Sequence, residues 1–189
     1  YRVDAKLWKV TEIWDKAAID AFPNNDSMGI HPLKRVYHPI YGNLLEETDR
    51  WGFTTVYTYV EKTYQDPAPW LKNLLKEVYR PKPSGAGQEL VLRIAYTDHA
   101  DGVLADWGLV KSRSTFVTPV GATEAVERKT SFIYDPFGQL IAIHHPNVRR
   151  PDNTDQTDMK TEFEYNGPRR QLTRVTNEEG HWTDYGNFH

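Results

Sequence analysis

Hydrophobic and polar side chains alternate with a period of two in several short stretches, which is the pattern of a β-strand with two different faces. In "TTVYTYV", Thr55, Tyr57 and Tyr59 fall on one face, and Val56 and Val60 fall on the other. The stretch "TEFEY" alternates in the same way. Aromatic residues make up 13% of the chain, including 11 Tyr and 6 Trp, and this supply beside Thr and Val favours strands over helices. The pattern predicts a mainly β protein.

Tight-turn signals separate the alternating stretches. In "YDPFG", Pro136 supplies a fixed φ and Gly138 supplies a permissive residue, as a tight turn requires. The stretches "DRWG" and "NEEG" begin with Asp or Asn and end with Gly52 and Gly180. Short strands joined by such turns predict antiparallel β-hairpins.

The spacing of leucine, glycine and tyrosine recurs along the chain. Leu44 lies eight residues before Gly52, and Gly52 lies five residues before Tyr57; residues 172–185 reproduce both intervals. A recurring interval indicates a repeat protein built from one supersecondary unit. We interpret the unit as a β-hairpin in which aromatic residues pair across neighbouring strands. The residues that define the repeat are Tyr37, Gly42, Leu44, Gly52, Tyr57, Tyr59, Tyr134, Asp135, Gly138, Leu140, Tyr165, Leu172, Gly180 and Tyr185.

Shorter copies carry only the tyrosine and the leucine. Tyr134 and Leu140 are six residues apart in "YDPFGQL", and Tyr1 and Leu7 have the same interval. The interval is seven residues in "YNGPRRQL" and in the copy that begins at residue 37. We therefore expect residues 1–189 to form a single repeat segment, a fragment of a larger protein.

Two segments, 61–95 and 147–158, interrupt the repeat, and we interpret both as connecting excursions. The second is polar without a strong apolar anchor, which predicts an exposed hairpin loop or a mobile one. In the first, apolar residues recur at helical spacing and predict a short amphipathic helix near 68–78. The apolar face of that helix would carry Trp70, Leu71, Leu74, Leu75 and Val78.

Charge and composition exclude several classes of function. The formal net charge of −3 argues against nucleic acid as the main partner, because phosphate binding needs a basic surface. The chain contains no cysteine, so disulfides and thiolate metal sites are excluded. No apolar run approaches the roughly 20 residues of a membrane span.

Three groups of polar residues resemble sites, and each has a simpler structural interpretation. His144 and His145 are strand neighbours and point to opposite faces, which disfavours a shared metal ion; the same geometry separates Glu46 and Glu47. Residues 98–102, "DHADG", lack the acidic spacing of an EF-hand and predict a turn. The sequence contains neither a nucleophile elbow nor a phosphate loop. We therefore expect no enzymatic activity, metal or cofactor.

The stretches "YDPFGQL", "YGNLLEETDRWGFTTVYTY" and "QLTRVTNEEGHWTDY" resemble YD repeats, the tyrosine–aspartate units of Rhs proteins and of the B and C components of insecticidal toxin complexes. "QDPAPWLKNLLKEVYRP" resembles the WL insertion that occurs between YD units in bacterial relatives. Since such an insertion can be extended, helix and extended chain are both open for 68–78. The sequence departs from the family pattern where Arg2, His38 and Asn166 replace the aspartate that Asp135 provides.

This resemblance implies a curved or spiral β-sheet that forms part of a hollow shell around a toxin payload. The partners would be the rest of the same shell, the payload and a delivery or secretion component. The protein would be a secreted or extracellular bacterial protein, and association with the cell surface is also open. Any toxic activity would belong to a C-terminal payload. The alternative is an extracellular adhesion or carbohydrate-binding module, with Trp51, Trp107 and Trp182 stacking on sugar rings.

Overall fold

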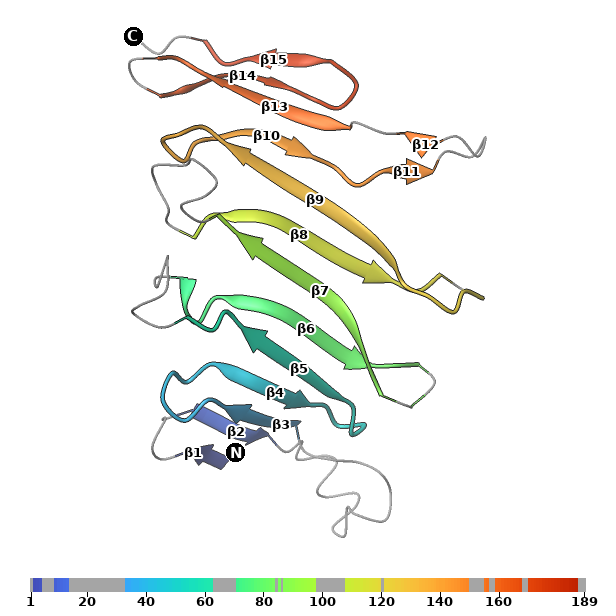
Figure 1. The fold of residues 1–189 in the computed structure, drawn as a ribbon. Coiled ribbons are helices and arrows are strands. Elements are labelled where there is room, and N and C mark those ends of the chain that lie inside the picture. The colour runs from blue at the N-terminus through green and yellow to red at the C-terminus, as the bar shows by residue number, and fades with distance from the viewer. Residues whose placement is uncertain are drawn as a thin grey trace. The chain divides into compact units, whose positions relative to one another are not determined.

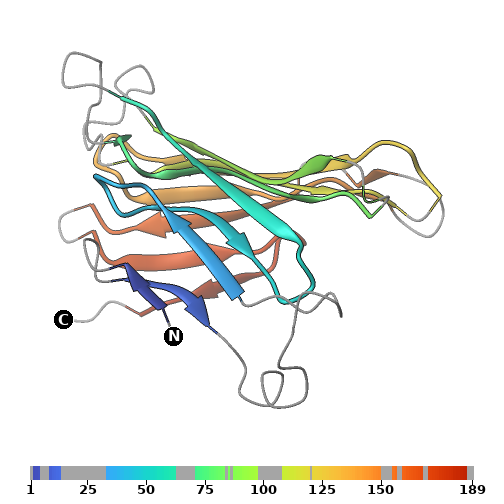
Figure 2. The same cartoon turned by 90° about the horizontal axis from the view of Figure 1, so that it is seen from below.

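The fold is almost entirely β-sheet, as the sequence predicts. In the computed structural model the chain divides into two compact units, residues 1–61 with 72–92 and residues 62–71 with 93–189. All strand pairs described in either unit are antiparallel, and each strand lies beside a neighbour in sequence (Figures 1 and 2). The structure describes residues 2–4, 9–13, 33–62, 71–83, 85, 87–97, 108–119, 121–149, 155–156, 159–167 and 170–186.

Six strands of the first unit pair in chain order (Figure 1). Three of the junctions between them shift register by a bulge, and two of these lie at a tyrosine that ends a strand, Tyr37 or Tyr59. A bulge bends the strand and increases its twist locally. The strands are β1 (Arg2–Asp4), β2 (Lys9–Ile13), β3 (Leu33–Tyr37), β4 (Leu44–Thr48), β5 (Thr54–Tyr59) and β6 (Leu75–Pro81).

The second unit repeats this arrangement. Strand β7 (Gln88–Tyr96) begins in the first unit and ends in the second. The bulges again fall at the tyrosines that end strands, at Tyr134 opposite Leu140 and at Tyr165 opposite Leu172. The remaining strands, in paired order, are β8 (Val110–Val117), β9 (Val126–Tyr134), β10 (Leu140–His144), β13 (Lys160–Tyr165), β14 (Leu172–Thr176) and β15 (Trp182–Asp184).

A small hairpin interrupts the sequence between β10 and β13. It consists of β11 (Val148–Arg149) and β12 (Asp155–Gln156), which pair antiparallel with each other. In Figure 1 it lies beyond the ends of β10 and β13, the two strands that it connects. Hairpin pairing is thus present between residues 148–149 and 155–156, and residues 150–154 lie outside the described residues.

The short helix expected near 68–78 is wrong for residues 71–78. Residues 68–70 lie outside the described residues. The chain turns at Leu71 and is a strand from Leu75. Val78 lies opposite Tyr57 on β5 and is buried. Pairing with a strand that has an open edge overrides a weak helical periodicity, because it satisfies the backbone and buries the same apolar side chains. Much of segment 61–95, expected as connecting chain, is thus sheet.

Few side chains are fully removed from solvent. Among the described residues, the buried hydrophobic side chains are Leu71 and Val78, and the buried polar ones are Thr97, Ser112 and Ser114. Most strand residues are half-buried along their whole length, as in β5 and β14. The apolar contacts are therefore spread along the sheets, with no deep central core in the described part of either unit.

Candidate functional site: the repeated turns

Three five-residue turns share one hydrogen-bonded geometry: residues 49–53, 135–139 and 177–181. In each, the N–H of the first residue donates to the carbonyl of the fifth at 2.8 to 3.0 Å, and the glycine N–H donates to the carbonyl of the first at 3.0 Å. The first residue is Asp or Asn, and its Oδ1 accepts two further backbone N–H groups at 2.8 to 3.1 Å. The side chain thus satisfies donors that the turn would otherwise leave unpaired.

Glycine is required at the fourth position of these turns. Gly52, Gly138 and Gly180 have φ values of 81°, 85° and 81°. This left-handed conformation brings the Cβ of other residues too close to the backbone. The turn therefore selects an Asx residue at its first position and a glycine at its fourth.

Two other turns contain one more residue, which explains the stretched Tyr-to-Leu interval. In 38–43 and 166–171 the first N–H donates to the sixth carbonyl at 2.7 and 2.9 Å, and the fifth N–H donates back to the first carbonyl at 2.9 Å. The fifth residue is left-handed, with φ of 67° at Gly42 and 52° at Arg170. The imidazole Nδ1 of His38 accepts the N–H groups of two turn residues at 3.2 Å, in the place of an Asx oxygen.

The first of these two closing bonds occurs twice more around longer loops, and the sequence pattern did not identify these copies. Val60 N–H donates to the Leu74 carbonyl at 2.8 Å, and Asn73 N–H donates to the Val60 carbonyl at 3.1 Å. Thr97 N–H donates to the Leu109 carbonyl at 2.8 Å. The residue before each accepting leucine, Asn73 or Gly108, has φ of 69°. A signal was present: the left-handed residue stands two positions before the first residue of the next strand, in "GNL", "NLL", "GLV", "GQL" and "RQL".

A tyrosine hydroxyl closes the open end of three hairpins. The tyrosine is the last residue of one strand, and its hydroxyl donates to the carbonyl of the first residue of a strand that pairs with it. The bonds are Tyr59 to Leu44 at 2.7 Å, Tyr134 to Val110 at 3.0 Å and Tyr165 to Leu140 at 2.9 Å. Burial raises the pKa of all three tyrosines, because loss of water disfavours the phenolate.

The two hairpins that share the eight-and-five spacing also share one register. Glu46 lies opposite Val56 in β4–β5, and Arg174 lies opposite Asp184 in β14–β15. All three residue pairs of one ladder correspond to those of the other, with residue numbers that differ by 128. Tyr185 therefore corresponds to Tyr57. The tyrosine that closes the hairpin of β4 and β5 is Tyr59, two residues after Tyr57.

Cross-strand ion pairs lie on the surface of both units. Arg35 Nε contacts Glu47 Oε2 at 2.7 Å, and this hydrogen bond raises the pKa of Arg35. Arg174 Nε contacts Asp184 Oδ1 at 2.7 Å, and the guanidinium lies 4.9 Å from the ring centre of Trp182. Exposed pairs of this kind contribute roughly 0 to 1 kcal/mol, so their main effect is to favour one register.

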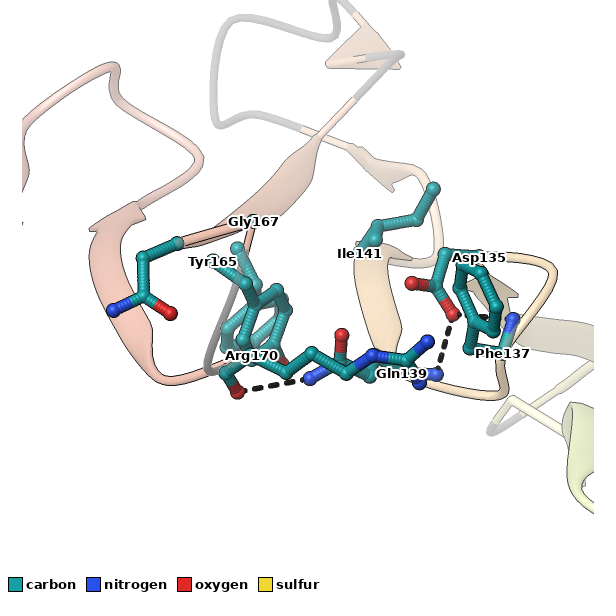
Figure 3. A pocket seen from close by; sticks show the side chains of 9 residues that line it. Asp135, Phe137, Gln139, Ile141, Tyr165, Gly167 and Arg170 are labelled. Carbon is teal, nitrogen blue, oxygen red and sulfur yellow. Dashed lines mark hydrogen bonds between the residues drawn. The ribbon is translucent and has the colours of Figure 1, made fainter.

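One pocket of the second unit lies between two consecutive turns that follow tyrosines (Figure 3). The guanidinium of Arg170 lies 3.6 Å from the ring centre of Phe137, and Gln139 Nε2 donates to the Arg170 carbonyl at 3.0 Å. These contacts connect one repeat to the next at the ends of their strands. The pocket has a volume of about 360 Å³ and is lined by Asp135, Phe137, Gln139, Ile141, Phe163, Tyr165, Asn166, Gly167 and Arg170.

The residues considered for catalysis or metal binding have structural partners or lie apart. His145 Nε2 is 2.9 Å from the hydroxyl of Thr161, and Glu47 is paired with Arg35. In the described part of the chain, no three His, Asp or Glu side chains come together as a metal site would require. Residues 98–102 lie outside the described residues.

The tryptophans of the alternative hypothesis differ in what the structure shows of them. Trp51 and Trp182 are 66% and 60% exposed. Trp107 lies outside the described residues. Within the described ranges, the structure contains no helix with the length and apolar character needed to cross a membrane.

Comparison with known proteins gives matches among solved structures. No protein-family model and no curated protein sequence matches the chain. A TcdB2–TccC3 structure without its hypervariable C-terminal region is 12% identical, with a TM-score of 0.38, over 93% of this chain and 9% of the other. A Photorhabdus luminescens Tc holotoxin pore with a TccC3 mutation is 11% identical, with a TM-score of 0.32, over 92% and 12%. The chain spans about a tenth of the length of the solved chains that it matches.

Proposed function

We propose that this chain is a structural segment of an Rhs/YD-repeat shell that encloses and protects a toxin payload for delivery. The observation that supports it best is the repeated closure of the hairpins, in which the tyrosine and the leucine of the YD pattern meet. A tyrosine hydroxyl bonds the carbonyl of the leucine in Tyr59–Leu44 and Tyr165–Leu140. A hairpin unit that closes in this way can be repeated along a sheet without limit, as the wall of a shell requires.

The distribution of buried residues supports the same proposal. A wall has two accessible faces, and most described strand residues are half-buried, with Leu71 and Val78 as the buried hydrophobic exceptions. In this proposal one face lines a chamber and the other faces outward. The chain itself contributes no catalysis, and any enzymatic activity belongs to the payload.

The experiment is to sequence the coding region on both sides of this segment and to image the purified parent protein by electron cryomicroscopy. We expect flanking YD repeats, a closed β-shell with this segment in its wall and density for a payload inside. Stop codons close to both ends of the segment would contradict the proposal, because the sheet edges of a shell segment need neighbouring strands.

A second candidate function, adhesion to carbohydrate, is favoured by the exposure of Trp51 and Trp182 near turn tips. Exposed indole rings can stack on the apolar faces of sugars, as aromatic rings do on other flat apolar surfaces. Binding on a glycan array that is lost in Trp51→Ala and retained in Val36→Ala, another exposed residue of the first unit, would support adhesion over the shell.

A further inference from the structure

The chain contains a single asparagine–glycine pair, Asn166–Gly167, and this pair lies in one of the repeated turns. An asparagine deamidates when the backbone nitrogen of the next residue attacks its side-chain amide. Glycine favours that attack because it has no Cβ to obstruct the nitrogen and leaves the backbone free to rotate. Every other asparagine of the chain precedes a larger residue. The sequence therefore singles out position 166 for this reaction.

The attacking nitrogen, that of Gly167, is accessible in the structure. Gly167 is exposed and lines the pocket between two turns (Figure 3). A Cβ at this position would meet no atom within 4 Å, so the space around the residue is open. In the described part of the chain, no group accepts a hydrogen bond from Gly167 N–H. Water can therefore take up the proton of this nitrogen when it attacks.

The side-chain amide of Asn166 is held in a polarised state. Its Oδ1 accepts Gln171 N–H at 3.0 Å, and its Nδ2 lies 3.4 Å from Gln171 Oε1. Attack of the Gly167 nitrogen on Cγ places negative charge on Oδ1, and a fixed backbone N–H stabilises an oxyanion of this kind. The folded turn thus supplies the donor before the reaction begins.

We propose that Asn166 deamidates spontaneously in the folded chain and that its turn accommodates the aspartate product. The Gly167 nitrogen bonds to Asn166 Cγ and loses its proton to water, and the side-chain nitrogen leaves as ammonia, which gives a succinimide ring. Water then opens the ring. Cleavage between the ring nitrogen and Cγ gives aspartate, and cleavage between that nitrogen and the main-chain carbonyl carbon gives isoaspartate. A water molecule is consumed and ammonia is released, and this inference does not depend on a shell or a payload.

The turn at Asp135 shows how the aspartate product fits. Asp135 follows Tyr134 as Asn166 follows Tyr165. The Oδ1 of Asp135 accepts two backbone N–H groups of its own turn, at 2.8 and 2.9 Å. A carboxylate therefore caps a turn at the equivalent position, and an aspartate at 166 keeps an acceptor for Gln171 N–H.

Isoaspartate at position 166 has a different effect on the turn. The main chain then passes through Cβ and Cγ, which lengthens the turn. The carbonyl of Asn166, which accepts Arg170 N–H at 2.9 Å, becomes part of a free carboxylate outside the main chain. We therefore expect the isoaspartate form to be less stable than the aspartate form.

The test follows each asparagine of the complete, folded chain during incubation in mildly alkaline buffer, by peptide mass spectrometry and isoaspartyl methyltransferase labelling. Asn177 is the internal reference, because its Oδ1 also caps a turn but Glu178 follows it. We expect Asn166 to react at least about tenfold faster than Asn177, because the Glu178 side chain obstructs the attacking nitrogen. Equal rates at the two positions, or reaction of Asn166 only in urea, overturn the proposal.

Variants test the attacking group and the product separately. Gly167→Ala is expected to slow the reaction of Asn166 at least about tenfold, because the added Cβ obstructs the nitrogen. Asn166→Asp reproduces the product and is expected to keep the original urea midpoint, whereas Asn166→Ala removes the acceptor for Gln171 N–H and should lower it. An unchanged rate in Gly167→Ala overturns the mechanism. An Asn166→Asp variant as unstable as Asn166→Ala overturns the fit of the product.

Discussion

At the scale of single residues, the turns depend on one backbone conformation. A left-handed residue stands two positions before the first residue of a strand at Gly42, Gly52, Asn73, Gly108, Gly138, Arg170 and Gly180. Five of these seven are glycine because only glycine adopts this conformation without steric cost. Asn is the next most tolerant residue, and the Arg170 side chain is held over the ring of Phe137.

Gly180 tests the cost of this conformation in isolation. A Cβ at Gly180 would meet no atom within 4 Å, so Gly180→Ala adds only the strain of φ at 81°. We expect a loss of roughly 1 to 2 kcal/mol in the free energy of unfolding, measured by urea denaturation. The matched control is Gly167→Ala, which also has free space and does not have a left-handed φ; it should leave stability unchanged or slightly higher. Equal losses in the two variants would contradict the explanation.

The tyrosine closure can be tested by removing one hydroxyl. Tyr165→Phe leaves the Leu140 carbonyl without the 2.9 Å hydrogen bond, and we expect a loss of about 0.5 to 1.5 kcal/mol in unfolding free energy. Tyr185→Phe serves as the control, because Tyr185 is exposed and its hydroxyl has no hydrogen bond to the described residues. A Tyr165→Phe variant as stable as Tyr185→Phe would show that the closure contributes nothing.

At the scale of elements, the hairpin is fixed at both ends by different chemistry. In the hairpin of β4 and β5, the Asp49 turn lies at one end and the hydroxyl of Tyr59 closes the other. The ladder between them contains Thr48 and Thr54, whose hydroxyls are 2.9 Å apart. A one-residue slip would move each side chain to the other face and break all three features, so the register is strongly determined.

Strand β6 is stabilised chiefly by its partner rather than by its own propensity. Val78 is 7% exposed, and we expect Val78→Ala to lower unfolding free energy by about 1 to 3 kcal/mol. Val36→Ala, at a strand position that is 49% exposed, should cost less than about 0.5 kcal/mol. Thermal or urea unfolding of the two variants measures the difference, and the reverse order would show that β6 does not bury this residue in solution.

At the scale of the molecule, half-buried tyrosines couple stability to alkaline pH. Burial raises the pKa of Tyr57 and Tyr59 in the first unit, and of Tyr96, Tyr134 and Tyr165 in the second. The folded state therefore retains the phenolic protons to higher pH than the unfolded state, in which the pKa is about 10. Their contribution to stability is complete below that pH and is lost as the pH rises through the higher folded pKa values.

We expect the urea midpoint to change little below about pH 9 and to fall as the pH rises above about 10, the ordinary tyrosine pKa. A double variant, Tyr134→Phe with Tyr165→Phe, should start at lower stability and lose less of it over the alkaline range. A flat response of the original chain would contradict the role of the half-buried tyrosines.

The strand-and-turn architecture could be predicted from residues close together in the sequence. Asp135 and Gly138 specify their turn through local hydrogen bonds and a local φ, and both are visible as letters in the chain. The copies at 60–74 and 97–109 share the first closing bond, but they could not be found by spacing, because their loops are longer. A search for glycine or asparagine, the residue types that tolerate a left-handed conformation, directly before a leucine would have included them.

The sequence alone determined the alternating strands, the Asx–Gly turns and the equivalence of residues 44–57 and 172–185, because each depends on contacts within one hairpin. The tertiary structure decided that residues 75–81 form a strand, since the edge of β5 supplies the partner. It also decided which tyrosines close the hairpins: Tyr59 reaches the carbonyl of Leu44, while Tyr57, in the position equivalent to Tyr185, lies opposite β6. Both outcomes depend on which strands pair and in which register, and the propensity of a single segment does not determine that.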